Sequence, residues 1–157
     1  MLSSNSITKQ VIVGSAPVNE SDIQHLKLHY GVDSVINLQT QKDLQVRNIN
    51  LENLLTIYQQ HQIELYQFPI LDVDADDMAK KILPAILKLT TLVKDNKTIY
   101  VHCNAGICRA TSTVLGYLNL YEGMSLEEGL AFIRSKRPIA NPYLSAVKSA
   151  LDDLDKN

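Results

Sequence analysis

The segment Thr98-Ile-Tyr-Val-His-Cys-Asn-Ala-Gly-Ile-Cys-Arg-Ala110 passes from a run of β-branched and aromatic residues into a segment of helical periodicity. The loop from Cys103 to Arg109 therefore follows the carboxyl end of a predicted strand and precedes the amino end of a predicted helix. Backbone N–H groups in such a loop can converge on one point, where the helix dipole adds partial positive charge. This arrangement predicts an anion site.

The residue types in the loop favour a phosphate ester as the anion. Gly106 permits a backbone turn that other residues resist, and Arg109 offers a planar fork that matches two phosphate oxygens. We expect the loop backbone to cradle the phosphate, through Asn104, Ala105, Gly106, Ile107 and Cys108.

The positive field of the loop also favours the thiolate of Cys103 over its thiol. A thiolate there can attack phosphorus and form a cysteinyl-phosphate, which water then releases. His102 is expected to orient the site rather than to act as a base, because a thiolate needs none. The leaving oxygen needs a proton from another loop, and four carboxylates cluster after the predicted strand Glu64 to Phe68, namely Asp72, Asp74, Asp76 and Asp77.

Short strand-like runs alternate with longer helical patterns, which predicts an α/β fold with a central, mixed and mostly parallel sheet flanked by helices. No repeat or linker divides the chain, so we expect a single domain over residues 1–157. The predicted strands are Val11 to Val13, Ser34 to Leu38, Glu64 to Phe68 and Thr98 to His102. The predicted helices are Ser21 (as cap) to Tyr30, Leu51 to Gln60, Met78 to Lys94, Ala110 to Tyr121, Leu126 to Arg137 and Tyr143 to Leu154.

The composition sets limits on partners and location. A net charge of -2 gives no general attraction to nucleic acid or to an anionic membrane, so neither is an expected partner. Two cysteines five positions apart form no secreted disulfide framework, which favours a reducing, cytoplasmic location. The histidines have no partner at metal-ligand spacing, so we predict no metal site. We further expect no cofactor and a monomeric enzyme. Arg134, Lys136 and Arg137 are interpreted as a solvated helix end that could raise the local concentration of anions.

The pattern of Cys103, five residues and Arg109, with His102 before it and Ala105-Gly106 within it, resembles the signature of the protein tyrosine phosphatase superfamily. From about Val13 onward the chain looks like a dual-specificity phosphatase domain. The resemblance implies a three-layer fold and a metal-independent phosphomonoesterase. It also implies that the general acid sits about thirty residues before the nucleophile on a mobile loop, which points to Asp72 and then to Asp74.

Within that family the chain is similar to glucan phosphatases in Gly14-Ser15, Ile36 to Gln39, Lys42 to Leu44 and Ala110. Relatives carry Ser or Thr where Ala110 stands, a hydroxyl that assists departure of the thiolate, and Thr111 is the residue that could take over this role. Two places that carry aromatic residues in the subgroup read Gln45-Val46-Arg47 and Val73 here. The expected substrate is a phosphorylated protein or a phosphorylated glucan, and a phosphorylated lipid also stays open.

Two other classes of function remain open, a phosphate-binding module with lost catalysis and a rhodanese-like sulfur carrier. The fragment Ile107-Cys-Arg109 also resembles the loop end of low-molecular-weight tyrosine phosphatases, which implies a reversible disulfide between Cys103 and Cys108. The alternative is that Cys108 is only a small loop residue.

Overall fold

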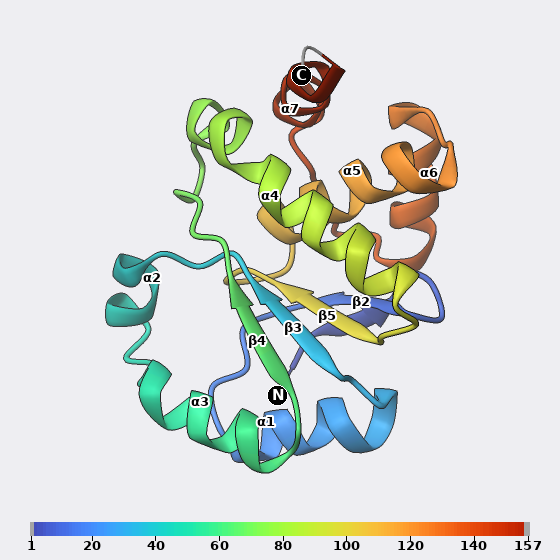
Figure 1. Cartoon of the computed structure of the whole chain (residues 1–157). Helices are drawn as coiled ribbons and strands as arrows, with labels where there is room; N and C mark the ends of the chain where they lie inside the picture. Colours follow the sequence, from blue (N-terminus) through green and yellow to red (C-terminus); the bar gives the residue numbers. More distant parts are fainter. Residues whose placement is uncertain (1, 156–157) are drawn as a thin grey trace.

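A five-stranded sheet runs through the middle of the computed structural model, which describes residues 2–155 (Figure 1). The strands lie in the order β1-β2-β5-β3-β4, with β1 antiparallel to β2 and every other neighbouring pair parallel. Their bounds are β1 Ser4–Ser6, β2 Val11–Gly14, β3 Ser34–Asn37, β4 Glu64–Gln67 and β5 Ile99–His102.

Every residue of β2, β3 and β5 is buried, as expected for parallel strands that are covered on both faces. All four predicted strands are present. The edge strand β1 was not predicted, because Ser4–Ser6 has neither β-branched residues nor alternating polarity. Register places Gly14 and Asn37 beside His102, so the carboxyl ends of β2, β3 and β5 meet at one edge of the sheet.

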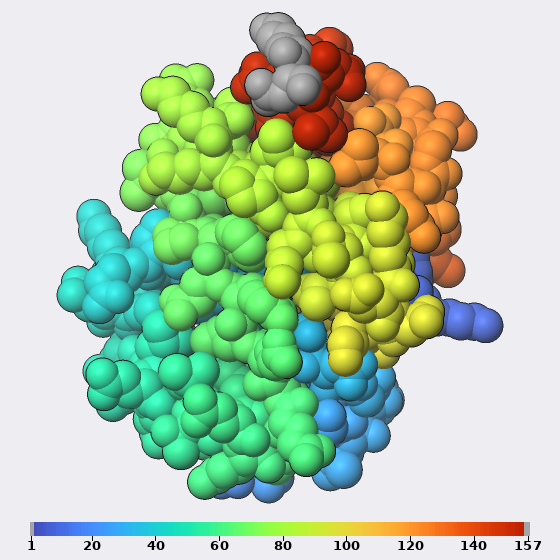
Figure 2. Space-filling model, viewed as in Figure 1, coloured from blue at the N-terminus to red at the C-terminus, as the bar shows by residue number. Residues whose placement is uncertain are grey.

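Helices cover both faces of the sheet, which confirms the predicted α/β three-layer class. On one face lie α4 (Ala75–Lys94), α5 (Arg109–Glu122), α6 (Leu126–Lys136) and α7 (Leu144–Asp155). On the other lie α1 (Glu20–His25), the π-helical segment η1 (Leu26–Tyr30) and α3 (Leu51–Gln60), while the short α2 (Gln41–Val46) follows the carboxyl end of β3. Figure 2 shows α4 crossing the front of the molecule in yellow-green, with α7 in red packed above it.

The helix α4 shows how periodicity positions the site. The residues Ile82, Ile86, Leu89 and Val93 lie on one side of this helix and are buried, in one cluster with Val101 of β5 and Val114 of α5. Pro84 lies inside the helix rather than at its first turn. This packing fixes β5 and α5 relative to each other, and with them the two ends of the loop that joins them.

The predicted cap of the first helix was wrong. The helix begins after Asn19 rather than Ser21, because the Asn19 side chain accepts a hydrogen bond from the Asp22 N–H, and the Asp22 carboxylate accepts one from the Val18 N–H in return. The predicted end of this helical segment at Tyr30 is confirmed, because Gly31 follows it with a left-handed φ of 69°. Among the described residues, no helix combines the length and apolar character needed to cross a membrane.

Candidate active site

The loop between β5 and α5 lies at the edge of the sheet where the strand ends meet. Cys103 follows the last residue of β5 and is only 3% exposed, and Arg109, the first residue of α5, is only 1% exposed. Cys103 belongs to the same hydrophobic cluster as Val101 and Val114. The two ends of the loop are therefore anchored in the core.

Each backbone carbonyl from Asn104 to Cys108 accepts a hydrogen bond from a donor outside the loop segment 103–108. The donors, in that order, are the Ala16 N–H (3.0 Å), Arg137 Nη2 (3.0 Å), Arg137 Nε (2.7 Å), the Asn141 N–H (2.7 Å) and the Ser112 N–H (2.8 Å). Because a trans peptide unit is planar, its N–H points opposite to its carbonyl. The N–H groups that follow these carbonyls, those of residues 105–109, therefore point to the inner side of the loop, and those of residues 105–108 have no acceptor among the described residues.

Gly106 has the backbone conformation that its sequence position predicted. Its φ is +70°, a left-handed value that side chains disfavour, and a Cβ added there would lie 2.5 Å from the backbone carbon and oxygen of Gly14. Both conditions exclude any other residue type without movement of the loop or of β2.

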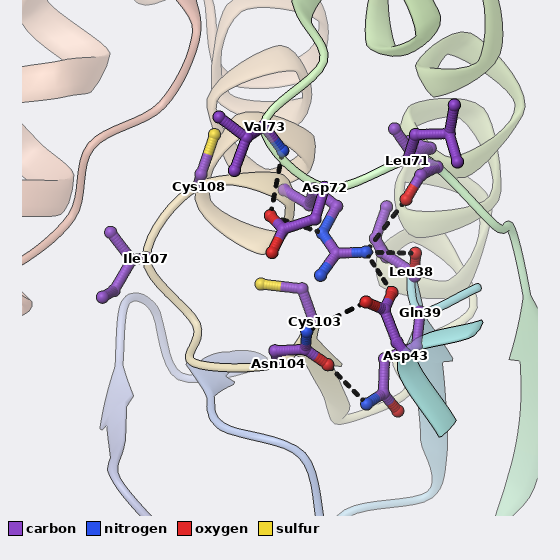
Figure 3. A network of polar contacts seen from close by, with 12 residues as sticks. Leu38, Gln39, Asp43, Leu71, Asp72, Val73, Cys103, Asn104, Ile107 and Cys108 are labelled. Atoms are coloured by element: carbon purple, nitrogen blue, oxygen red, sulfur yellow. Dashed lines mark hydrogen bonds and ion pairs between the residues drawn. The ribbon is translucent and has the colours of Figure 1, made fainter. Parts of the chain in front are cut away.

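Only one of the three nitrogen atoms of the Arg109 guanidinium, Nη1, forms hydrogen bonds within the described residues. Its Nη1 donates to Oδ2 of Asp43 at 2.6 Å and to the carbonyl oxygens of Ile70 and Leu38 at 2.9 and 3.4 Å (Figure 3). Its Nε and Nη2 are buried and have no hydrogen-bond partner among the described residues. Buried donors without partners are costly, so these two define the side of the group that is suited to an anion.

Asp43 is the site residue that sequence reasoning missed. It sits in the first turn of α2, where Thr40 and Asp43 form a capping box, and its Oδ1 accepts from Nδ2 of Asn104 at 3.1 Å. Partial burial raises the pKa of Asp43, but hydrogen bonds from Arg109 and the Thr40 N–H outweigh this and bring it to about 2. The capping-box spacing from Thr40 to Asp43 was the available signal.

The acidic loop between β4 and α4 divides its carboxylates by role. Asp74 caps α4 by accepting from the Asp77 N–H at 2.9 Å, and Asp77 in turn accepts from the Leu71 N–H at 2.8 Å. Asp72 makes no such cap. Its side chain is 47% exposed and lies 3.5 Å from Arg109 Nε, measured at Oδ1.

Asp72 and Cys103 line one cavity of about 240 Å³. The other lining residues are Arg47, Val73, Asn104, Ala105, Ile107, Cys108 and Arg109. The structure thus brings together Cys103, Arg109, Asp72 and the predicted cradle.

The remaining predicted residues support the loop from behind. His102 is fully buried, which lowers its pKa to about 4 against the raising effect of its contact with the Cys103 carbonyl, 3.0 Å from Nδ1. The hydroxyl of Thr111 lies 2.6 Å from the Ile107 carbonyl and 3.0 Å from that of Cys108. Its part in thiolate departure stays a prediction, as does the disulfide, since both cysteines are free.

Arg137 overturns one prediction. Arg134 and Lys136 are exposed, but Arg137 is only 1% exposed and bonds the loop, so it is not part of a solvated helix end. It follows the end of α6 and turns inward, which periodicity alone does not reveal. No group of His, Cys, Asp or Glu within residues 2–155 has the arrangement of a metal site.

The family model for the dual specificity phosphatase catalytic domain matches residues 12–152. The chain belongs to this family. It is 27% identical over 164 residues to laforin from Mus musculus, covering 96% of this chain and 48% of laforin. It is 30% identical over 152 residues to phosphoglucan phosphatase DSP4, amyloplastic, from Castanea sativa, covering 96% and 40%. The similarity to glucan phosphatases that the sequence indicated is thus confirmed.

The fold is also that of solved phosphatases. The active form of Tk-PTP superimposes with a TM-score of 0.76 at 22% identity, covering 99% of this chain and 97% of that one. The chain spans less than half the length of the curated relatives described above.

Proposed function

We propose that this chain is a cysteine-dependent phosphomonoester hydrolase of the dual-specificity type. The observation that carries the proposal is one cavity lined by Cys103, Asp72 and Arg109, where the buried Nη2 of Arg109 has no hydrogen-bond partner among the described residues and its Nε has only the Asp72 carboxylate, 3.5 Å away. These donors match the equatorial oxygens of a phosphoryl group as charge spreads over them in the transition state.

The proposed reaction has two displacement steps. The Cys103 thiolate attacks phosphorus, the bond from phosphorus to the ester oxygen breaks, and that oxygen takes a proton from Asp72. In the second step water attacks the cysteinyl-phosphate, its proton passes to the Asp72 carboxylate, and the thiolate leaves with release of inorganic phosphate. Asp72 fits this role because it lines the cavity and accepts a backbone bond only from the adjacent Val73 N–H, whereas Asp74 caps α4 and Asp77 accepts from the Leu71 N–H.

The two rival functions make different demands on the site. A binding module has no use for a carboxylate at the cavity mouth, whereas an acid catalyst needs one there. A sulfur carrier needs no planar donor pair spaced for phosphate oxygens. Turnover of para-nitrophenyl phosphate, lost in Cys103→Ser, supports the hydrolase, and sulfur transfer from thiosulfate at a higher rate would favour the carrier.

For the substrate we propose a phosphorylated protein ahead of a phosphorylated glucan. Sugar rings are held by stacking on aromatic faces, and none of the residues that line the cavity is aromatic. Val73 and Ile107 are instead exposed apolar side chains at the mouth, 79% and 38% exposed, which suit the ring of phosphotyrosine.

The substrate proposal is tested by phosphate release from a phosphotyrosine peptide and from amylopectin, measured side by side. We expect kcat/KM for the peptide to be the larger. Faster release from amylopectin would contradict the choice of substrate while leaving the hydrolase assignment intact. The cytoplasmic location and monomeric state remain sequence-based proposals.

A further inference from the structure

We propose that Arg137, held by the edge strand β1, is the positioning residue that keeps the loop N–H groups aimed at the phosphate. This inference rests on the proposed function. The two partners are far apart in the sequence. Strand β1 precedes the segment 12–152 that matches the family model, and Arg137 lies near the end of that segment.

The Arg137 side chain makes four hydrogen bonds. Two go to the loop, from Nε to the Gly106 carbonyl at 2.7 Å and from Nη2 to the Ala105 carbonyl at 3.0 Å. Two go to the N-terminal segment, from Nη1 to Oδ1 of Asn5 at 2.7 Å and from Nη2 to Oγ of Ser3 at 3.1 Å. The guanidinium is thus a bridge between the loop and β1.

The two carbonyls that Arg137 binds belong to the peptide units on either side of the Gly106 Cα, the most flexible point of the loop backbone. Gly106 sits at a φ of +70°, and glycine populates both signs of φ readily. Rotation of either adjoining peptide unit would turn a carbonyl oxygen into the cradle and an N–H away from it. A carbonyl there would repel phosphate, so the orientation of these two units decides whether an anion binds.

A guanidinium suits this task better than an ammonium group. Its donors lie in one rigid plane and can bind two consecutive carbonyls and two further acceptors at once, whereas a lysine has three rotatable donors at one point. The neighbouring donors to the loop, the Ala16 and Asn141 N–H groups, bind the Asn104 and Ile107 carbonyls but do not reach the Gly106 carbonyl.

The edge strand fixes the guanidinium in turn. The Ser15 N–H donates to the Ser3 carbonyl at 2.9 Å, the Ser3 N–H donates to Oγ of Ser15 at 3.0 Å, and Ser4–Ser6 pairs with β2. The acceptors on Ser3 and Asn5 are therefore themselves held to the sheet, next to the strand end where the loop starts.

The test compares Arg137→Lys, Arg137→Met and a matched control, Lys136→Met, in the full chain. Turnover of para-nitrophenyl phosphate and the inhibition constant of orthovanadate are measured together with the thermal unfolding midpoint. We expect both Arg137 variants to lose about tenfold to a hundredfold in kcat and to bind orthovanadate at least about tenfold more weakly. The control should stay within about twofold of the wild type.

Orthovanadate affinity separates positioning from general stability, because a merely structural residue would lower the unfolding midpoint without weakening the anion in the folded protein. Affinity within about twofold of the wild type in folded Arg137→Met overturns the proposal. If Arg137→Met does not fold, the Asn5→Ala variant is measured instead. We expect it to bind orthovanadate about threefold to tenfold more weakly than the wild type, and unchanged affinity would overturn the proposal. A wild type that does not turn over para-nitrophenyl phosphate would instead contradict the proposed function.

A second inference rests on a different cavity, of about 310 Å³, that adjoins the first through Arg47, Asp72 and Asn104. We infer that it receives an acidic side chain of the phosphorylated protein, beside the phosphorylated residue. This too rests on the proposed function. Lys42 and Arg47 line the cavity and are exposed, and their side chains have no ion-pair or hydrogen-bond partner among residues 2–155.

The carboxylates in the same cavity do not cancel these cations. Asp43 is already bonded by Arg109 and Asn104, and when Arg109 is counted with Lys42 and Arg47 the cations outnumber the carboxylates Asp43 and Asp72 by one. The net field at the outer wall is therefore positive, and exposed Val46 and Leu71 supply apolar area for the stem of a long side chain.

Matched phosphotyrosine peptides with Glu or Gln beside the phosphorylated residue test this inference. We expect kcat/KM to be about threefold to tenfold higher for the Glu peptide at low salt, and the ratio to fall with added salt. The ratio should approach one in Lys42→Gln and stay unchanged in the control Lys88→Gln. A kcat/KM ratio near one in the wild type overturns the subsite. Glucose 1,6-bisphosphate and glucose 6-phosphate are measured beside the peptides, and a preference that appears only for the bisphosphate overturns the peptide as the occupant.

Discussion

His102 gives a prediction whose size follows from its surroundings. The ring is fully buried behind the loop, stacks on Tyr100 with ring centroids 5.7 Å apart, and places Nδ1 3.0 Å from the Cys103 carbonyl. Burial is the largest influence and lowers its pKa from 6.5 to about 4. The contact with the carbonyl opposes this shift, and the charge of Arg109 adds to it.

The sign of the pH dependence follows from proton uptake. Between about pH 4 and 6.5 the unfolded chain binds a proton at His102 and the folded chain does not, so the free energy of unfolding falls as the pH drops through this window. At pH 5 the loss relative to pH 7 should be about 2 kcal/mol from this group alone.

The assay is urea unfolding at pH 7 and at pH 5 for the wild type and His102→Gln. The variant loses the packing of the ring and should be less stable at both values, but its stability should fall by about 2 kcal/mol less between them. Equal falls in the two proteins would refute the reasoning that His102 is buried as the neutral ring.

Three further predictions concern two substitutions and the reactivity of one cysteine. Asp43→Ala leaves the buried Arg109 without its carboxylate and should cost about 3 kcal/mol in urea unfolding above about pH 4, a penalty that shrinks toward pH 2 as Asp43 itself protonates in the wild type. Gly106→Ala forces a side chain against Gly14 and should abolish turnover of para-nitrophenyl phosphate, so wild-type turnover would contradict the loop geometry. Burial and the nearby Cys103 raise the pKa of Cys108 to about 11, so peptide mass spectrometry should find it alkylated slowly by iodoacetamide at neutral pH although it is the more exposed cysteine.

The sequence predicted the strand, loop and helix that hold Cys103 and Arg109 because local signals coincide there, namely β-branched residues, a glycine and helical periodicity. It did not predict β1, whose serines and asparagine carry no strand pattern. It also left α2 unassigned, because six residues hold too little periodicity to recognise. Each of these elements carries a partner of a buried arginine: Asn5 of β1 binds Arg137, and Asp43 of α2 binds Arg109.

Buried charge explains the other failures. Arg137 sits in a run of basic residues at the end of a helix, a pattern that usually means solvent, and only the tertiary arrangement brings Asn5 to it across the sheet. Asp43 and Arg109 are likewise distant in sequence. Pairings of this kind depend on strand order, which the sequence of a single chain does not specify.

The central claim is that Cys103 becomes covalently bonded to phosphorus during turnover. Rapid acid quenching with para-nitrophenyl phosphate, followed by digestion and fragmentation mass spectrometry, measures this directly. The account predicts one phosphoryl group on Cys103 of the wild type and none on Cys103→Ser. With the same substrate, Asp72→Asn should carry the phosphoryl group on a larger fraction of its molecules, because the second step has lost its base. Steady turnover with no phosphoryl group on Cys103, or with the group on another residue, would contradict it.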